Sequence, residues 1–178
     1  MKSLTLILGG ARSGKSNHGL ELAFLHQNVL FVATAQAWDS DMRHRIDVHK
    51  TERPPHWGTL EAPQHVGDAL LKSDYPADCI LIDDMTLLAS NVILTLSEDT
   101  DTPTAEKAVL AETEKLLDAL GQIDVDVIIV SNEVGLGIVP ATKLGRNYRD
   151  ALGRANQKIA QMANNVLFMV SGLPMVVK

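Results

Sequence analysis

The chain has 178 residues, of which 46% are hydrophobic and 21% are charged, and its formal net charge is −6. This length suits one domain, because a chain of this size buries about 70% of its unfolded surface. The acidic balance argues against a nucleic-acid partner, which normally requires a basic face, and no apolar run approaches the ~20 residues of a membrane span. Since no signal-peptide pattern is visible, we expect a cytoplasmic protein in which the single Cys79 is buried and inert.

The first recognisable stretch is an apolar run followed at once by a glycine-rich segment. Residues 4–8 are typical of a strand, and residues 9–16 read Gly-Gly-Ala-Arg-Ser-Gly-Lys-Ser. This fits the P-loop pattern, in which backbone N–H groups surround phosphates, Lys15 reaches the outer phosphates and the Ser16 hydroxyl takes Mg²⁺. Residues 16–26 have helical spacing, so the strand–loop–helix context is present. The sequence therefore predicts a nucleoside triphosphate site.

A second apolar run, rich in β-branched residues, occupies residues 29–34. Such a run is typical of a strand that is covered on both faces, so the first crossover is a βαβ unit. Ligands of open α/β sheets bind at the carboxyl ends of the strands. Thr34, Ala35 and Gln36 are therefore candidates for contacting the nucleotide.

A polar helix is predicted over residues 40–50, and it breaks at Arg53-Pro54-Pro55. Histidine and basic residues are dense in this region, which contains Arg43, His44, Arg45, His49, Lys50, Arg53 and His56. Two interpretations stay open: a function beside the phosphate site, or a solvated helix face with ordinary surface histidines. A zinc site is disfavoured, since no Cys accompanies these residues.

A short strand is predicted over residues 59–62 and a helix over residues 64–72. The apolar run that begins at Cys79 then ends in Asp83 and Asp84. An acidic residue at the tip of a buried strand is the Walker-B pattern, which holds Mg²⁺ opposite the P-loop hydroxyl. Asp83 is the first choice for this role and Asp84 the second.

The second half of the chain repeats the alternation of helices and strands. We expect helices over residues 86–96, 102–120 and 142–165, a strand over residues 125–131, and a hairpin of residues 166–171 and 175–177. Thr102 and Pro103 are predicted to begin the second of these helices, and Gly121 to end it. No linker or internal repeat is visible, so residues 1–178 are expected to form one α/β domain with a mostly parallel sheet and a C-terminal hairpin.

Three segments together closely resemble the bifunctional adenosylcobinamide kinase/adenosylcobinamide-phosphate guanylyltransferase family of vitamin B12 synthesis. They are residues 9–16, residues 45–57 with Arg45-Ile-Asp-Val-His-Lys50 and Arg53-Pro-Pro-His-Trp57, and residues 131–140 with Ser-Asn-Glu-Val-Gly-Leu-Gly-Ile-Val-Pro. The resemblance spans essentially the whole chain and includes residues 154–157. It implies a RecA-like P-loop NTPase fold, a homotrimer, ATP and GTP as substrates with Mg²⁺, and the corrinoids adenosylcobinamide and adenosylcobinamide phosphate as acceptors.

The resemblance also implies roles for individual residues. In the family, the histidine that matches His49 becomes covalently guanylylated, and Lys15 serves phosphoryl transfer. Nucleotide contacts are implied for Gly9, Gly10, Ala11, Arg12, Ser13, Gly14, Lys15, Ser16, Thr34, Ala35, Gln36, Lys50, Thr51, Glu52, Arg53, Glu61 and Asp83. The family usually has Cys after the acidic residue at the strand tip, so Asp84 leaves the choice of metal ligand open.

Two other classes of function are compatible with the P-loop. A P-loop kinase of another small molecule would form no covalent nucleotide adduct, and a non-catalytic nucleotide-binding switch would bind no corrinoid. The sequence does not identify the corrinoid pocket, the general base of the kinase step or the preferred phosphoryl donor. Products formed from adenosylcobinamide and GTP with Mg²⁺ would separate the three possibilities.

Overall fold

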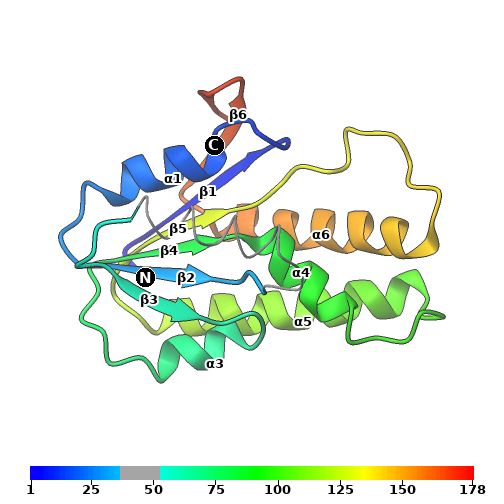
Figure 1. Cartoon of the computed structure of the whole chain (residues 1–178), viewed down its shortest axis with the longest axis horizontal. Coiled ribbons are helices and arrows are strands. Elements are labelled where there is room, and N and C mark those ends of the chain that lie inside the picture. Colours follow the sequence, from blue (N-terminus) through cyan, green and yellow to red (C-terminus); the bar gives the residue numbers. More distant parts are fainter. Residues whose placement is uncertain (37–52) are drawn as a thin grey trace.

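The structure, a computed structural model, describes residues 1–36 and 53–178. Its strands are β1 (Ser3–Gly9), β2 (Val29–Ala33), β3 (Gly58–Glu61), β4 (Cys79–Asp83), β5 (Asp126–Val130), β6 (Asn165–Val170) and β7 (Leu173–Val176). Its helices are α1 (Lys15–Ala23), α3 (Val66–Leu71), α4 (Met85–Ile93), α5 (Thr102–Gly121) and α6 (Lys143–Met162) (Figure 1). The predicted helix over residues 40–50 lies outside the described residues, apart from which each predicted element is present.

The strands form one seven-stranded sheet in the order β3-β2-β4-β5-β1-β6-β7. All neighbours pair in parallel except β6 and β7, which form an antiparallel hairpin. The prediction of an α/β fold with a mostly parallel sheet and a C-terminal hairpin is therefore confirmed. Because β5 separates β1 from β4, the P-loop strand and the strand with the acidic tip end two places apart at the same edge.

The two faces of the sheet are covered differently. Helix α1 packs on one face, against β1, β4 and β5, whereas α5 and α6 lie with α3 and α4 on the other (Figure 1). Odd and even positions of the buried strands point to opposite faces. Thus Leu81 belongs to the smaller core under α1, and Ile80 and Ile82 belong to the larger core under α5 and α6. The near-continuous apolar strands are explained by this double coverage.

Several boundaries differ from the expectations. Asp101, not Thr102, caps α5, because its carboxylate accepts a hydrogen bond from the Thr104 N–H over 3.0 Å. Helix α6 ends at Met162, three residues early, and β6 begins at Asn165. The hairpin turn is only Ser171 and Gly172, whose φ values of 51° and 85° fit the left-handed backbone of tight hairpin turns.

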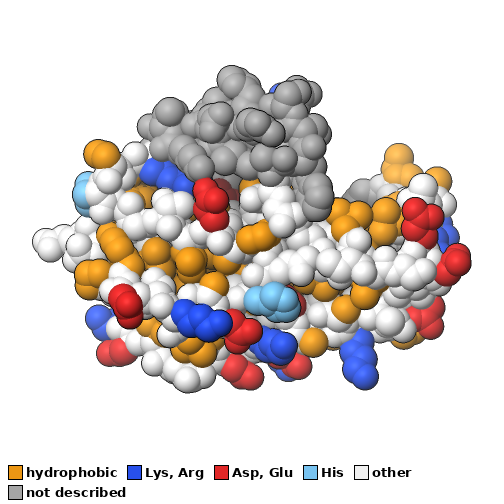
Figure 2. All heavy atoms as spheres, turned by 60° about the horizontal axis from the view of Figure 1, so that its bottom comes forward, with side chains coloured by type: hydrophobic (Ala, Val, Ile, Leu, Met, Phe, Trp, Pro, Cys, Tyr) orange, Lys and Arg blue, Asp and Glu red, His pale blue; other side chains and the backbone are white. Residues whose placement is uncertain are grey.

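No helix in the described part of the chain is long and apolar enough to cross a membrane. Acidic and basic side chains are interspersed over the face shown in Figure 2, rather than gathering by sign.

Cys79 is buried in β4, and burial raises the pKa of its thiol to about 12. A thiol with so high a pKa carries almost no thiolate at neutral pH, which is the form that reacts.

Candidate functional site

The P-loop runs from the carboxyl end of β1 to the first turn of α1. Gly14 immediately precedes α1 with a φ of 94°, a left-handed conformation that favours glycine. A Cβ at Gly9 would lie 2.6 Å from the Ser13 Oγ and 2.8 Å from the Met169 carbonyl oxygen. Glycine at both positions therefore lets the loop close tightly and lead directly into the helix N-terminus, which attracts anions.

Lys15 is folded into this loop. It is 7% exposed, and its Nζ donates a hydrogen bond to the Gly10 carbonyl oxygen over 2.8 Å. Burial lowers the pKa of Lys15, whereas the charges of Asp84 and Asp83 act to raise it. Among the described residues, the buried Ser13 hydroxyl has no hydrogen-bond partner. The Ser13 hydroxyl and the Lys15 ammonium are therefore available to donate hydrogen bonds to the oxygens of a phosphate bound in the loop.

The two acids at the tip of β4 have different environments. The Ser16 Oγ donates a hydrogen bond to Asp83 Oδ1 over 3.3 Å. Asp84 instead caps α4 by accepting from the Leu87 N–H over 2.9 Å. Burial, followed by the nearby Asp83 charge, raises the pKa of Asp84 to about 6. Asp83 is therefore the carboxylate beside the P-loop hydroxyl, and Asp84 is committed to the helix.

The oxygens of Ser16 and Asp83 are hard ligands of the kind that Mg²⁺ takes. Magnesium usually binds one or two protein carboxylates or hydroxyls and fills its other positions with water and substrate phosphate oxygens. Within residues 1–36 and 53–178, no group of three His, Cys, Asp or Glu side chains could hold a metal by itself. The pair fits a cation that arrives with a nucleotide rather than a closed protein site.

Thr34, at the end of β2, fixes the tip of β4. Its buried hydroxyl donates to the Asp84 carbonyl oxygen over 2.7 Å and accepts from the Asp84 N–H over 3.0 Å. Ala35 and Gln36 follow at the same edge and are partly exposed. The three residues lie at the carboxyl end of β2, as predicted from the sequence. The Thr34 hydroxyl, however, is hydrogen-bonded to the Asp84 backbone.

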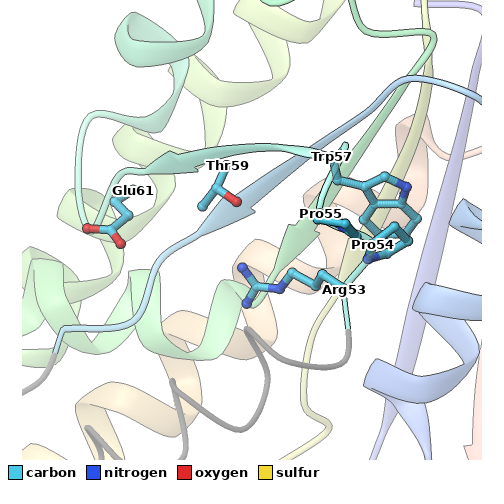
Figure 3. Close-up of a pocket in the computed structure, with 6 residues that line it drawn as sticks. All are labelled: Arg53, Pro54, Pro55, Trp57, Thr59 and Glu61. Atoms are coloured by element: carbon cyan, nitrogen blue, oxygen red, sulfur yellow. The ribbon is translucent and has the colours of Figure 1, made fainter.

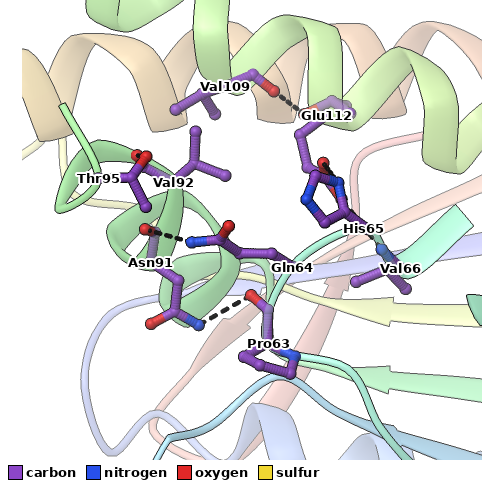
Figure 4. A network of polar contacts seen from close by, with 10 residues as sticks. Pro63, Gln64, His65, Val66, Asn91, Val92, Thr95, Val109 and Glu112 are labelled. Atoms are coloured by element: carbon purple, nitrogen blue, oxygen red, sulfur yellow. Dashed lines mark hydrogen bonds and ion pairs between the residues drawn. The ribbon is translucent and has the colours of Figure 1, made fainter.

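Asn91 is a site-supporting residue that the sequence interpretation missed. This buried amide on α4 donates to the carbonyl oxygens of Thr34, over 2.8 Å, and Pro63, over 2.9 Å. The backbone carbonyl oxygen of Asn91 in turn accepts a hydrogen bond from the Gln64 Nε2 over 2.7 Å (Figure 4). Asn91 therefore ties the ends of β2 and β3 to α4. An amide side chain among the mostly apolar residues 87–94 is the signal that could have identified it.

A hollow of about 380 Å³ lies beside β3 and is lined by Arg53, Pro54, Pro55, Trp57, Thr59 and Glu61. The Arg53 guanidinium lies over the Phe31 ring, 3.3 Å from its centroid. In Figure 3, Arg53 and Glu61 lie on either side of Thr59. Two of the residues implied to contact nucleotide, Arg53 and Glu61, are thus brought to one hollow, although eight positions separate them in the sequence.

The remaining predicted site residues, His49, Lys50, Thr51 and Glu52, lie outside the described residues. His56 is described and exposed, with its backbone carbonyl oxygen accepting from the Tyr75 hydroxyl. The described part of the site therefore comprises the P-loop, the tips of β2 and β4, and the hollow beside β3.

Comparison with known proteins identifies the chemistry that accompanies this geometry. The family described as "Cobinamide kinase / cobinamide phosphate guanyltransferase" matches residues 5–177. The bifunctional adenosylcobalamin biosynthesis proteins CobU of Escherichia coli (strain K12) and of Salmonella typhimurium (strain LT2) are 37% and 39% identical to the chain, each over 98% of this chain and 99% of the relative. The bifunctional adenosylcobalamin biosynthesis protein CobP of Pseudomonas aeruginosa (strain PAO1) is 42% identical over 97% of this chain and 96% of the relative.

Proposed function

This chain belongs to the cobinamide kinase / cobinamide phosphate guanyltransferase family, a family of bifunctional enzymes of adenosylcobalamin biosynthesis, and we propose that one P-loop site serves both of its reactions. In the first, adenosylcobinamide is phosphorylated with ATP or GTP. In the second, GMP passes from GTP through a covalent GMP–histidine intermediate at His49 to adenosylcobinamide phosphate, giving adenosyl-GDP-cobinamide.

The contact between Ser16 and Asp83, beside the folded-in Lys15, carries this proposal. In the kinase step, the acceptor hydroxyl oxygen bonds to the γ-phosphorus while the bond to the β-phosphate oxygen breaks. Phosphoryl transfer of this kind depends mainly on positioning and on neutralising negative charge. The P-loop N–H groups and the Lys15 ammonium supply both.

The guanylyl step uses the same phosphate grip with a different reacting atom. A neutral His49 nitrogen attacks the α-phosphorus, and pyrophosphate leaves from the positions that the P-loop holds in both reactions. An imidazole is largely neutral at pH 7, since its reference pKa is about 6.5. Lys50 and Arg53 follow His49 in the sequence, and positive charges close to its ring would favour the neutral form and offset the charge of the α-phosphate.

We further propose that Mg²⁺ binds the Ser16 hydroxyl and the Asp83 carboxylate together with the nucleotide. The ion would neutralise charge on the phosphates. Asp84 is the weaker candidate because its carboxylate already accepts the Leu87 N–H and its raised pKa reflects burial away from water. The hollow with Arg53 and Glu61 is proposed to hold part of the bound nucleotide, as the family resemblance implies for both residues.

Assembly into a homotrimer is also part of the proposal. The edge strand β7 exposes Leu173 (70%), Met175 (57%) and Val176 (78%), an apolar row on an open sheet edge. An exposed apolar edge strand offers unpaired backbone groups and apolar side chains with which another chain can associate. Light scattering of the purified protein should give three times the chain mass, and a monomer at micromolar concentration would contradict the trimer.

The test of the proposed function is the set of products formed from adenosylcobinamide, GTP and Mg²⁺. The proposal expects adenosylcobinamide phosphate first and adenosyl-GDP-cobinamide later, with GDP and pyrophosphate as the two by-products. Phosphate release from GTP without any corrinoid product would favour a nucleotide switch. Phosphorylation of another alcohol in preference to the corrinoid would favour a different small-molecule kinase.

A further inference from the structure

A second hollow, of about 600 Å³, lies between the segment after β5 and helix α6. Two segments that the nucleotide site does not use meet there. Glu133 and Gly135 come from residues 131–140, and Arg154, Asn156 and Gln157 come from α6. Figure 1 shows the chain leaving β5, arching outward and returning as α6. Topology therefore brings both segments to one cavity.

This hollow adjoins the P-loop. The Glu133 N–H donates a hydrogen bond to the Gly9 carbonyl oxygen over 3.0 Å. Because Glu133 lines the hollow, this bond links the hollow directly to the first glycine of the P-loop. Leu8, the residue before Gly9, lines the hollow as well. The Glu133 carboxylate is held by the Gly135 N–H. A ligand in this hollow could thus extend a flexible arm toward the phosphates.

The charges around the hollow do not suit a nucleotide. Arg149 and Arg154 face Glu106, Glu133 and Asp150, so two positive and three negative groups give a formal balance of −1. Arg149 is paired with Asp150 over 2.9 Å, and Arg154 with Glu106 over 3.9 Å. Phosphates bind where positive charge or free N–H groups predominate. This lining favours a neutral or cationic ligand with hydrogen-bonding groups.

Gly153 leaves an open place on the face of α6 that lines the hollow. Glycine inside a helix costs about 1 kcal/mol relative to alanine. A Cβ at Gly153 would meet no heavy atom within 4 Å, so no described packing contact requires glycine there. Gly153 lies in the middle of α6 and lines the hollow. A ligand in the hollow could therefore approach the α6 backbone more closely at Gly153 than at a position that carries a side chain.

We propose that this hollow binds the corrinoid acceptor, an inference that rests on the proposed function. Adenosylcobinamide is a cationic, amide-bearing macrocycle with a flexible alcohol arm. Its primary amides match the side chains of Glu133 and Gln157, whereas the buried Asn156 amide is bonded to Ser131 and Asn132 and shapes the wall of the hollow. The positive charge of the ligand matches the slightly acidic lining. The neighbouring loop exposes Leu136 (82%), Ile138 (96%) and Val139 (62%), which suit the apolar faces of the ring. One edge of the corrinoid occupies the hollow while its arm points toward the P-loop.

The experiment fills the hollow and separates corrinoid binding from nucleotide chemistry. Gly153→Leu places a side chain in the open space, and Gly121→Leu is the matched control, because a Cβ there also meets nothing within 4 Å but lies at the exposed end of α5. We expect Gly153→Leu to raise the KM for adenosylcobinamide at least tenfold. Its KM for GTP, and its labelling by α-labelled GTP without corrinoid, should stay within twofold of wild type. Gly121→Leu should leave all three unchanged.

Gln157→Ala provides a second test that adds no bulk. It should weaken adenosylcobinamide binding by threefold or more in equilibrium dialysis, without lowering the melting temperature. Unchanged corrinoid binding in both Gly153→Leu and Gln157→Ala would overturn the proposal. If Gly153→Leu instead changes the oligomeric state and leaves the KM for adenosylcobinamide unchanged, the hollow belongs to a contact between subunits. If the wild-type protein turns over no corrinoid at all, the proposed function itself fails, a result distinct from wild-type turnover that is insensitive to these variants.

Discussion

The Ser16 hydroxyl lies 3.3 Å from Oδ1 of Asp83, although 67 positions separate the two residues in the sequence. The hydroxyl comes from the first turn of α1 and the carboxylate from the tip of β4, with β5 between their strands. Two side-chain oxygen atoms are thereby held at the edge of the sheet where the P-loop lies.

Lys15→Ala should lower both phosphoryl and guanylyl transfer by roughly 10²–10³-fold, a typical loss when one donor to a developing charge is removed. Lys15 is proposed to contact the β- and γ-phosphates. The γ-phosphate is transferred in the kinase reaction, and both leave as pyrophosphate in the guanylyl reaction. Initial rates of both reactions measure the effect. Lys107→Ala, at an exposed position on α5, is the control. Near-normal rates for Lys15→Ala in both assays would refute the P-loop assignment.

Asp83→Asn should raise the Mg²⁺ concentration needed for half-maximal kinase activity by roughly tenfold or more, as for loss of a metal-site partner. Asp84→Asn should have the smaller effect, because asparagine can still cap α4 and the Asp84 carboxylate does not contact Ser16. Magnesium titrations of both variants test this contrast. If Asp84→Asn needs more Mg²⁺ than Asp83→Asn, the metal ligand has been assigned to the wrong residue.

The buried Asp84 carboxyl should make metal-free stability depend on pH. Burial raises its pKa to about 6 in the folded protein from the ordinary value of 3.8, so between these two pH values the folded state binds the extra proton. The free energy of unfolding therefore falls as pH rises from about 4 to 6, by at most about 3 kcal/mol. Asp84→Asn should remove this fall and be more stable than wild type above pH 6.

Urea denaturation in EDTA at pH 4, 5, 6 and 8 measures the Asp84 effect. Asp118→Asn on the exposed side of α5 is the control and should follow the wild-type pH profile. Two results would contradict this assignment. In one, the free energy of unfolding of the wild type rises between pH 4 and 6. In the other, Asp84→Asn has the same pH profile as the wild type.

Asn91→Ala should lower the free energy of unfolding by about 2–4 kcal/mol, because it leaves the buried carbonyl oxygens of Thr34 and Pro63 without their donor. Since Thr34 also holds the Asp84 backbone, the Mg²⁺ requirement should rise with the loss of stability. Gln161→Ala, at an exposed position of α6, is the control. Wild-type values of both quantities in Asn91→Ala would remove Asn91 from the support of the site.

His49→Asn should abolish labelling of the protein by α-labelled GTP and Mg²⁺, and with it GMP transfer to adenosylcobinamide phosphate. Phosphorylation of adenosylcobinamide should persist, since γ-phosphoryl transfer needs no protein nucleophile. In the wild type, the phosphorus–nitrogen bond should be lost in acid and survive alkali. His44→Asn and His56→Asn are the controls. Label that persists in His49→Asn and disappears in a control would move the nucleophile, and label from γ-labelled GTP at His49 would refute attack at the α-phosphorus.

The sequence by itself determined the fold class and the position of the P-loop. Strand, loop and helix are adjacent at residues 4–26, so their pattern depends only on local spacing and on backbone conformations that glycine permits. The uninterrupted apolar strands predicted a sheet covered on both faces, and the hairpin was predicted from its turn residues. These features need no knowledge of distant contacts, which is why they could be identified before the structure.

Tertiary structure decided the features that depend on which distant segments meet. The sequence ranked Asp83 above Asp84 but left the choice open, and the strand order and the start of α4 place Asp83 beside Ser16 and Asp84 at a helix cap. The bonds of Asn91 to two strand ends, and the meeting of residues 131–140 with α6, likewise arise from packing across the sheet. Local propensity cannot encode such contacts, because the free energy that favours them is released only when elements far apart in the chain are brought together.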